Sequence, residues 1–229
     1  MIDYNVIQTG SQGNAVVIEK NILIDCGVSF VKIEPYFPDI KLVLLSHIHS
    51  DHFKPSTIRR MAHDKPLLRF GCGPWLAKPL VDAGVAKSQI DVLKENVAYN
   101  YGICNVIPVP VFHDVQNYGY KLHFPHGKVF YATDLGTLSG IVAKNYSLYL
   151  VESNYREEEL KARMDEKIAN GQYPYERRVL RYHLSEKQVN NWLYSNMDLN
   201  KSEYVYLHQH IDREGTDESS DSEFRLAEE

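Results

Sequence analysis

The sequence predicts an α/β domain in which helices cover stacked sheets, and two observations support this. Short apolar runs of strand length, rich in Val and Ile, alternate with Gly, Asn and Asp. Segments with helical spacing stand between and after these runs, and no internal linker separates them. The chain has 229 residues, of which 44% are hydrophobic and 24% charged. This composition excludes a disordered, collagen-like or coiled-coil protein.

The first half of the chain predicts an antiparallel meander followed by helices. Turn residues separate the first three apolar runs, as expected of neighbouring antiparallel strands. Two helices are expected at 55–63 and 74–82, because each begins with proline and Gly84 ends the second. The strands expected here are 6–7, 15–18, 22–24 and 42–45.

The second half predicts a further set of strands and then two helices. Asn154 is expected to cap a helix that Gly171 ends. Ser185 and Gln188 have the spacing of a capping box, so another helix is expected to begin there. The strands expected in this half are 106–112, 118–124, 129–133, 148–151 and 204–207.

Charge divides the chain into a body and a tail. Residues 1–211 are expected to form one domain, and 212–229 an acidic, disordered tail with little to bury. The tail holds eight acidic and two basic residues, a net charge of -6, while the whole chain carries -5. The body therefore has a net charge of about +1. Because the tail accounts for the negative net charge of the whole chain, that charge does not argue against a nucleic-acid partner.

The cysteines and the N-terminus indicate a cytoplasmic protein. Cys26, Cys72 and Cys104 are widely spaced, and none stands in a C-x-x-C pair, so neither a disulfide framework nor a cysteine zinc site is expected. The N-terminus has no basic region followed by an apolar core. No later run approaches the roughly 20 apolar residues that span a bilayer, so no membrane partner is expected.

A cluster of histidines follows the apolar strand at 42–45. His47 and His49 would project to one side by the two-residue period of a strand, and Asp51 and His52 stand where the chain must turn. A lone surface histidine is usually without function. Three imidazoles so close together carry a desolvation and repulsion cost unless something binds them. These residue types hold zinc, or manganese and iron in oxygen-richer sites.

With these residues the sequence resembles the metallo-β-lactamase-fold hydrolase superfamily, whose H-x-H-x-D-H signature is followed by a lone His, an Asp and a final His. His113, Asp134 and His208 stand in that order here. More narrowly, the sequence resembles the YycJ-type branch and its phage-encoded relatives. The resemblance implies a four-layer αββα sandwich. It extends to the segments 10–14, 24–27, 113–120, 133–136, 152–154 and 183–185.

The resemblance also implies two divalent metal ions. Zinc is the preferred candidate, and manganese and iron are the alternatives. Such a pair shares a water whose pKa falls toward about 7, which gives a bridging hydroxide at neutral pH. Because His208 is followed by Gln209-His210, His210 is an alternative last ligand, but His208 directly meets the end of the strand. The implied ligands are His47, His49 and His113 for the first ion, Asp51, His52 and His208 for the second, and Asp134 as the bridge, with Asp51 also counted as catalytic.

A proton donor is implied by the same resemblance. His183 matches the histidine of the Gly-His-Ser-Thr motif in transfer-RNA 3′-processing members, and Glu152 matches the carboxylate that pairs with it. Such a pair would raise the pKa of the imidazole and fix its tautomer. The alternative is that His183 only helps to cap the helix that begins at Ser185.

Arginine and tyrosine residues stand directly before His183. Three arginines among tyrosines suit phosphate contact and base stacking. The alternative is a solvated helix face on which the arginine stems cover apolar surface. The remaining histidines, His63, His123 and His126, have no ligand pattern and are expected to be structural. The candidate substrate-binding residues are Arg177, Arg178, Arg181 and Tyr182.

Three functions remain open at this point. The leading one is a metal-dependent phosphodiesterase, most simply a nuclease acting on DNA or RNA. The second is a hydrolase of small esters, thioesters, lactones or cyclic nucleotides on the same metal pair. The third is a binding protein that metal stabilises and that has no activity. True β-lactamase activity is not expected, because the sequence shows no secretory signal. In addition, the complete set of Asp51, His52 and Asp134 is present and favours phosphoryl chemistry.

Overall fold

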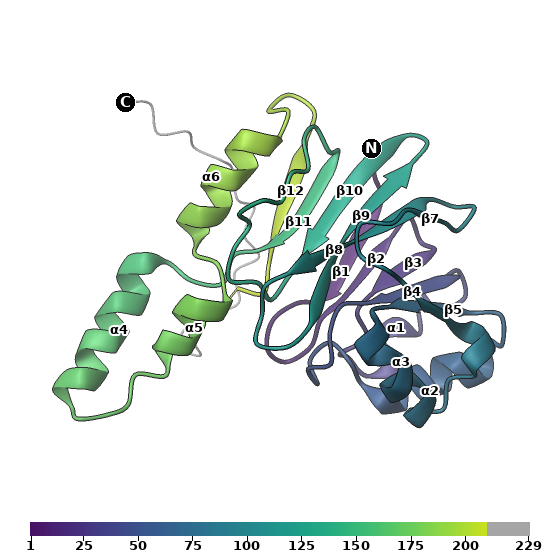
Figure 1. Ribbon diagram of the computed structural model, residues 1–229, viewed down its shortest axis with the longest axis horizontal. Coiled ribbons are helices and arrows are strands. Elements are labelled where there is room, and N and C mark those ends of the chain that lie inside the picture. Colours follow the sequence, from purple (N-terminus) through teal and green to yellow (C-terminus); the bar gives the residue numbers. More distant parts are fainter. Residues whose placement is uncertain (210–229) are drawn as a thin grey trace.

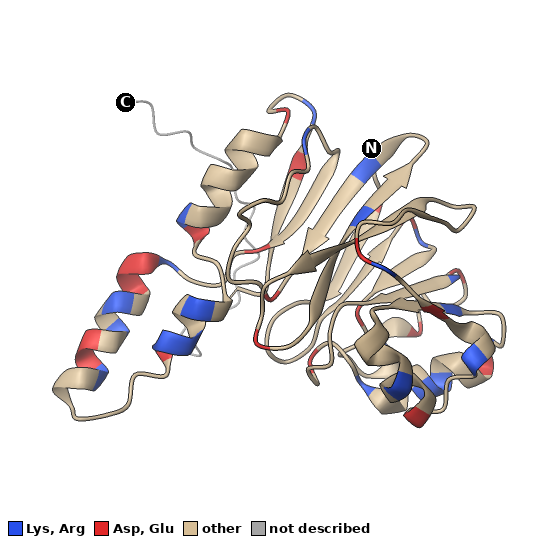
Figure 2. Ribbon diagram, viewed as in Figure 1, with Lys and Arg blue, Asp and Glu red and all other residues tan. Residues whose placement is uncertain are grey.

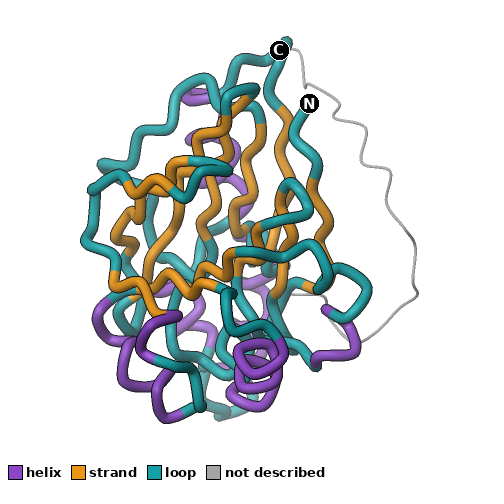
Figure 3. Tube along the Cα trace, turned by 90° about the vertical axis from the view of Figure 1, so that its right-hand side faces the viewer, coloured by secondary structure: helices purple, strands orange, loops and turns teal. Residues whose placement is uncertain are grey.

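Two six-stranded sheets with helices against their outer faces form the body of the protein (Figure 1). The computed structural model describes residues 1–209. Most helical segments lie toward one end of the strands in the view of Figure 3. The predicted four-layer αββα sandwich is confirmed. The acidic tail 212–229 and His210 lie outside the described residues.

The first sheet contains strands β1 to β6 in sequence order. The three leading strands pair antiparallel, which confirms the predicted meander, and the following strands pair parallel. The last two strands were not expected, because they are short and contain Arg69, Gly71 and Asp91 among their apolar residues. The strands are β1 (Tyr4–Gln8), β2 (Ala15–Ile18), β3 (Ile22–Ile24), β4 (Leu42–Leu45), β5 (Arg69–Cys72) and β6 (Ile90–Val92).

The second sheet has the order β12-β11-β10-β9-β8-β7. Strands β7 to β10 pair antiparallel, whereas β10, β11 and β12 are parallel. All five strands predicted in this half are present, with ends that shift by one or two residues. The strands are β7 (Tyr99–Asn100), β8 (Asn105–Val111), β9 (Asn117–Phe124), β10 (Gly127–Ala132), β11 (Leu148–Glu152) and β12 (Glu203–Leu207).

The four predicted helices are present as α2, α3, α4 and α6, with one correction, whereas α1 and α5 were not predicted. Asn154 does not cap α4: the N-cap is Arg156, and the Asn154 amide donates to the His208 carbonyl instead, at 2.9 Å. The capping box of α6 is confirmed, because Ser185 and Gln188 exchange hydrogen bonds of 2.9 and 3.2 Å. The helices are α1 (Phe30–Ile33), α2 (Pro55–Asp64), α3 (Pro74–Asp82), the 3-10 turn Lys87–Gln89, α4 (Glu157–Ala169), α5 (Glu176–Tyr182) and α6 (Glu186–Asn196).

Three apolar layers follow from the two-residue period of the strands. On β4, Val43 and Leu45 face α2 and α3, whereas Leu42 and Leu44 face the second sheet. The second sheet alternates in the same way, since Tyr131 faces inward and neighbouring side chains pack on α6. The inter-sheet layer includes Val16, Ile18, Ile22, Ile24, Val106, Tyr120, Leu122, Val129, Leu148 and Leu150.

Buried tyrosine hydroxyls connect the two sheets. Tyr120 donates to the Leu45 carbonyl at 2.6 Å, and Tyr131 donates to Asp25 Oδ2 at 2.8 Å. Both hydroxyls are therefore satisfied although the rings are fully buried. The three cysteines are buried and unpaired, as expected from the sequence.

Helices α4 and α5 form an arm that projects from the body, which we define as residues 156–184 (Figure 1). The two ends of the arm meet at the body, where Tyr155 bridges Ser185 and the backbone N–H of Asn154 donates to the Leu184 carbonyl at 3.0 Å. Only Leu160 is buried on α4. An ion pair between Lys167 and Glu176 joins the two helices.

Gly27 sets the position of the loop that carries Asp51. A Cβ on Gly27 would overlap the Asp51 carbonyl, which accepts from Asn14 N at 2.6 Å. Only glycine therefore allows this close approach of two backbones.

We expect Gly27→Ala to lower the free energy of unfolding by about 1–3 kcal/mol, because the loop must move. Urea denaturation measures this change. Ser29→Ala is the matched control, since Ser29 is exposed and makes no capping bond, and it should stay within about 0.5 kcal/mol of wild type. Equal effects of both substitutions would contradict the close-approach argument.

Candidate metal centre

The histidines and carboxylates singled out from the sequence converge where several strands end. His47 and His49 follow β4, His113 follows β8, Asp134 follows β10 and His208 follows β12. Strands β8, β10, β11 and β12 run in the same direction, because β8 and β10 are both antiparallel to β9. Their carboxyl ends therefore meet at one edge of the second sheet.

The first cluster consists of His47, His49 and His113, whose ligand atoms lie within 4.8 Å of one another. His47 Nε2 stands 3.1 Å from His49 Nδ1. Burial lowers the pKa of His47 well below its ordinary value, and the nearby His52 adds to this. Burial also lowers the pKa of His113. Neutral imidazoles are the form that binds divalent metal ions.

The second cluster consists of Asp51, His52 and His208, again within 4.8 Å. Asp134 stands between the clusters: its Oδ2 lies 2.8 Å from His52 Nε2 and 3.1 Å from His208 Nδ1. Its Oδ1 lies 4.0 Å from His113 Nε2. The structure thus brings together all seven residues named as ligands from the sequence.

The charges at Asp134 fit a cation. Burial opposes ionisation of this carboxyl, but His208 and His52 outweigh it and hold its pKa well below the ordinary value. Burial also opposes the charge on His52, yet Asp134 and Asp25 raise the pKa of that imidazole well above its usual value. His208 Nδ1 is buried and makes no well-directed hydrogen bond within residues 1–209. A divalent ion would satisfy these donor atoms.

The far ring nitrogens of three histidines are anchored, which leaves their Nε2 atoms directed into the centre. Partners of this kind fix the tautomer and orientation of metal ligands. The contacts are His47 Nδ1 to Ser46 Oγ at 2.9 Å, His52 Nδ1 to Asp25 Oδ2 at 2.7 Å, and His113 Nδ1 to the Tyr182 carbonyl at 3.3 Å.

Two supporting residues were not predicted as part of the site. Asp25 is fully buried and accepts from both the amide and the hydroxyl of Ser46 at 2.8 Å. Asn14 donates to Asp51 Oδ2 at 3.3 Å, and its amide nitrogen lies 2.8 Å from His52 Nε2. Both lie in segments that carry the family resemblance. Their position beside Gly13 and Gly27 was the available signal.

Three residues at the centre have a strained backbone. Asp25, Asp134 and His208 have φ angles of 61°, 56° and 53°, in the left-handed region that non-glycine residues rarely adopt. Each such residue costs on the order of 1–3 kcal/mol, and strain of this kind clusters at functional sites.

His183 and Glu152 form the predicted pair. His183 Nδ1 lies 2.6 Å from Glu152 Oε1, and Glu152 Oε2 accepts from Leu135 N at 2.9 Å. Burial alone would lower the pKa of His183, but the hydrogen bond and charge of Glu152 raise it. Capping of α6 is performed by Ser185. His183 also groups with Asp134 and His208 within 4.8 Å, so a ligand role competes with proton donation.

The candidate substrate-binding residues lie on α5, whose basic bands stand out in Figure 2. Arg178 forms an ion pair with Asp114. Arg177 is exposed and forms no ion pair with any residue from 1 to 209. The Arg181 guanidinium lies 5.3 Å from the Tyr182 ring centroid. The four residues thus share one short helix but differ in their contacts.

Three other histidines lie outside the clusters, as predicted. His63 contacts Asp64 at 2.9 Å, His123 contacts the Tyr146 hydroxyl at 2.7 Å, and His126 contacts Glu19 at 3.1 Å.

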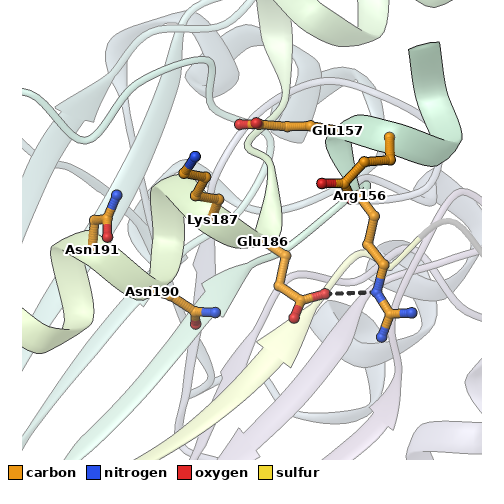
Figure 4. A pocket seen from close by; sticks show the side chains of 7 residues that line it. Arg156, Glu157, Glu186, Lys187, Asn190 and Asn191 are labelled. Carbon is orange, nitrogen blue, oxygen red and sulfur yellow. Dashed lines mark hydrogen bonds and ion pairs between the residues drawn. The ribbon is translucent and has the colours of Figure 1, made fainter. Parts of the chain in front are cut away.

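A surface hollow of about 350 Å³ lies between α6 and the start of α4, where Arg156 pairs with Glu186 at 2.9 Å (Figure 4). Charged side chains of both signs line it, together with Asn190 and Asn191. None of the histidines of the two clusters lines this hollow, so the candidate metal centre lies elsewhere.

Comparison with known proteins identifies the family. The family described as "Beta-lactamase superfamily domain" matches residues 20–194. The chain belongs to this superfamily. The beta-lactamase superfamily fold implies binding of divalent metal ions, and the His and Asp clusters described above are suited to it. The resemblance to metallo-β-lactamase-fold hydrolases stated from the sequence is confirmed.

Individual superfamily members are similar over most of the chain. Exodeoxyribonuclease YycJ of Bacillus anthracis is 26% identical over 196 residues, which cover 78% of this chain and 70% of that protein. The YycJ-type branch is therefore confirmed, whereas the phage-encoded relatives stay a prediction. The chain also resembles the metallo-beta-lactamase fold protein YhfI of Bacillus subtilis, with a TM-score of 0.70, 15% identity, and coverage of 92% and 87%.

Human tRNase Z, short form, is a further structural neighbour, with a TM-score of 0.63, 14% identity, and coverage of 91% and 92%. At this identity the likeness concerns the fold alone. No helix within residues 1–209 has both the length and the apolar composition needed to cross a membrane.

Asp134→Ala is expected to weaken divalent metal binding at least roughly 10-fold, because Asp134 contacts members of both clusters. Metal analysis after dialysis against zinc or manganese measures this. The control Asp165→Ala removes an exposed carboxylate on α4 and should bind as wild type does. Unchanged metal content in Asp134→Ala would refute the bridging role.

Proposed function

We propose that this protein is a metal-dependent phosphodiesterase that acts on nucleic acid, most simply a nuclease. It would use two divalent metal ions, for which zinc is the preferred candidate and manganese and iron are the alternatives. The observation that carries the proposal is the His183–Glu152 pair beside Asp134, since phosphodiester hydrolysis needs a proton donor near the metal centre. The names of the relatives, an exodeoxyribonuclease and a tRNase Z, support the same reaction class.

The residues of the centre divide the work as follows. His47, His49 and His113 would hold one ion, Asp51, His52 and His208 the other, and Asp134 both. Ions bound there polarise a phosphoryl oxygen and lower the pKa of a coordinated water. His183, with its Nδ1 held by Glu152, would direct Nε2 toward the leaving oxygen and protonate it. Asp51 is held in place by Asn14, so its carboxylate is oriented before substrate arrives.

The arm supplies the contacts to nucleic acid in this proposal. Arg177 and Arg181 are exposed on α5, and Tyr182 lies next to His183. Guanidinium groups bind phosphates, and a tyrosine ring stacks on bases of a single strand. A strand lying along α5 would therefore present a phosphate to His183.

The direct test is cleavage of single-stranded and double-stranded DNA and RNA by the protein loaded with zinc or manganese. His183→Ala is expected to lower the rate by about 10²–10⁴-fold, as for loss of a general acid, while it retains the metal. Loss of metal in His183→Ala would instead favour a ligand role. If wild type cleaves only small esters or cyclic nucleotides, or nothing at all, the nuclease proposal fails.

The pH dependence tests the proton donor separately. His183 must be protonated to act, so the rate should fall as pH rises through its pKa, which Glu152 raises. Glu152→Gln removes this charge, lowers the pKa, and should shift the fall in rate to lower pH for the same metal. The control Glu158→Gln changes an exposed carboxylate at the start of α4 and should leave the profile unchanged. An unchanged profile in Glu152→Gln would contradict the assignment.

A further inference from the structure

The C-terminal end of α5 is built against the first histidine cluster. The Tyr182 carbonyl lies 3.3 Å from His113 Nδ1, and the Tyr182 ring packs on Phe112 with 5.9 Å between ring centroids. A Cβ on Gly136 would overlap the Arg181 carbonyl, so the backbones of α5 and of the turn after Asp134 touch. The arm thus forms one wall of the metal centre.

Asp114 connects this wall to the histidines. Its Oδ1 lies 3.1 Å from His113 Nε2 and 3.4 Å from His49 Nε2, while Oδ2 pairs with Arg178 of α5. Oδ1 is buried and makes no well-directed hydrogen bond within residues 1–209. One carboxylate therefore faces two imidazoles on one side and a guanidinium of the arm on the other.

The contact with His49 is directional. His49 Nδ1 faces His47 Nε2, so His49 Nε2, which faces Asp114, is the ring nitrogen that does not point toward the other imidazole. Carboxylates in this position hold the ring orientation of a histidine ligand. Ser46 and Asp25 have the same relation to His47 and His52. Asp114 completes this pattern at His49.

We propose that Asp114 and Arg178 form a latch that holds α5 against the first cluster and orients His49, so that metal affinity and the order of the arm depend on each other. Asp114 and Arg178 are positioning residues in this scheme. The inference rests on the assignment of the first cluster as metal ligands and does not require any particular substrate.

The ion pair with Asp114 distinguishes Arg178 from the other arginines of α5. The charge of Arg178 is already neutralised by Asp114, whereas Arg177 has no ion-pair partner among the described residues. A phosphate would therefore bind Arg177 more readily than Arg178. Arg178 is 70% exposed, and an exposed ion pair contributes about 0–1 kcal/mol to stability. A merely structural pair would thus leave metal affinity unchanged.

The test compares Asp114→Asn and Arg178→Ala with wild type. Zinc affinity is measured by chelator competition, and coordination at the first cluster by the visible absorption of the Co²⁺-loaded protein. Asp114→Asn should bind zinc about 10- to 100-fold more weakly, because it also removes the carboxylate that faces His49. Arg178→Ala should bind zinc up to about 5-fold more weakly, because the pair is exposed. Both variants should show an altered Co²⁺ spectrum. Both should also show faster amide hydrogen exchange over the arm. The double variant should bind zinc no more weakly than Asp114→Asn, because Arg178 acts on the cluster through Asp114.

Two controls define the result. Arg177→Ala changes the neighbouring arginine and should leave zinc affinity, the Co²⁺ spectrum and exchange of the arm at wild-type values. Arg178→Lys keeps the charge and should restore most of the protection lost in Arg178→Ala.

The proposal is overturned if Arg178→Ala binds zinc as wild type does, or if the effects of the two single variants add in the double variant. None of these three measurements uses a nucleic-acid substrate. A failure of the latch is therefore distinguishable from a failure of the proposed nuclease activity.

Discussion

A buried chain of charged groups joins the two sheets, and the centre depends on it. Asp25 follows β3, His52 lies in the loop after β4, and Asp134 follows β10. His52 lies 2.7 Å from Asp25 and 2.8 Å from Asp134. Burying an unpaired carboxylate costs several kcal/mol. Both carboxylates are tolerated because His52 lies between them and Tyr131 donates to Asp25 from the second sheet. The distance between the sheets at this edge is therefore set by polar contacts.

The strained backbone follows from the same constraint. Asp25, Asp134 and His208 each stand one or two residues after a strand and have φ angles in the left-handed region, which turns the chain away from the strand direction. A residue in an extended conformation there would continue along the strand direction. The strain is affordable only because hydrogen bonds hold each residue: Ser46 binds Asp25, Asn117 binds the Asp134 carbonyl at 2.8 Å, and Thr9 binds the His208 amide at 2.7 Å.

The sequence predicted what short-range patterns determine. The strand at 42–45 and the histidines after it were recognisable because alternation and ligand spacing are local. Asp114 was visible only as a neighbour of His113, since its contacts with His49 and Arg178 join distant parts of the chain. The error at Asn154 has the same cause: its amide has the chemistry of a cap, but the carbonyl of His208, 54 residues away, takes the hydrogen bond.

The position of α5 connects the arm to the candidate metal centre. The helix forms a wall of the first cluster at Tyr182 and delivers His183 directly afterwards, while Glu152 stays fixed at the end of β11 by Leu135. The base of the arm is held to the body where Tyr155 bridges Ser185. Under the proposed function, a nucleic acid bound to α5 would act on the ring of His113 through the Tyr182 carbonyl and on His183 through the next residue. Substrate contact and the geometry of the centre would then be coupled through this helix.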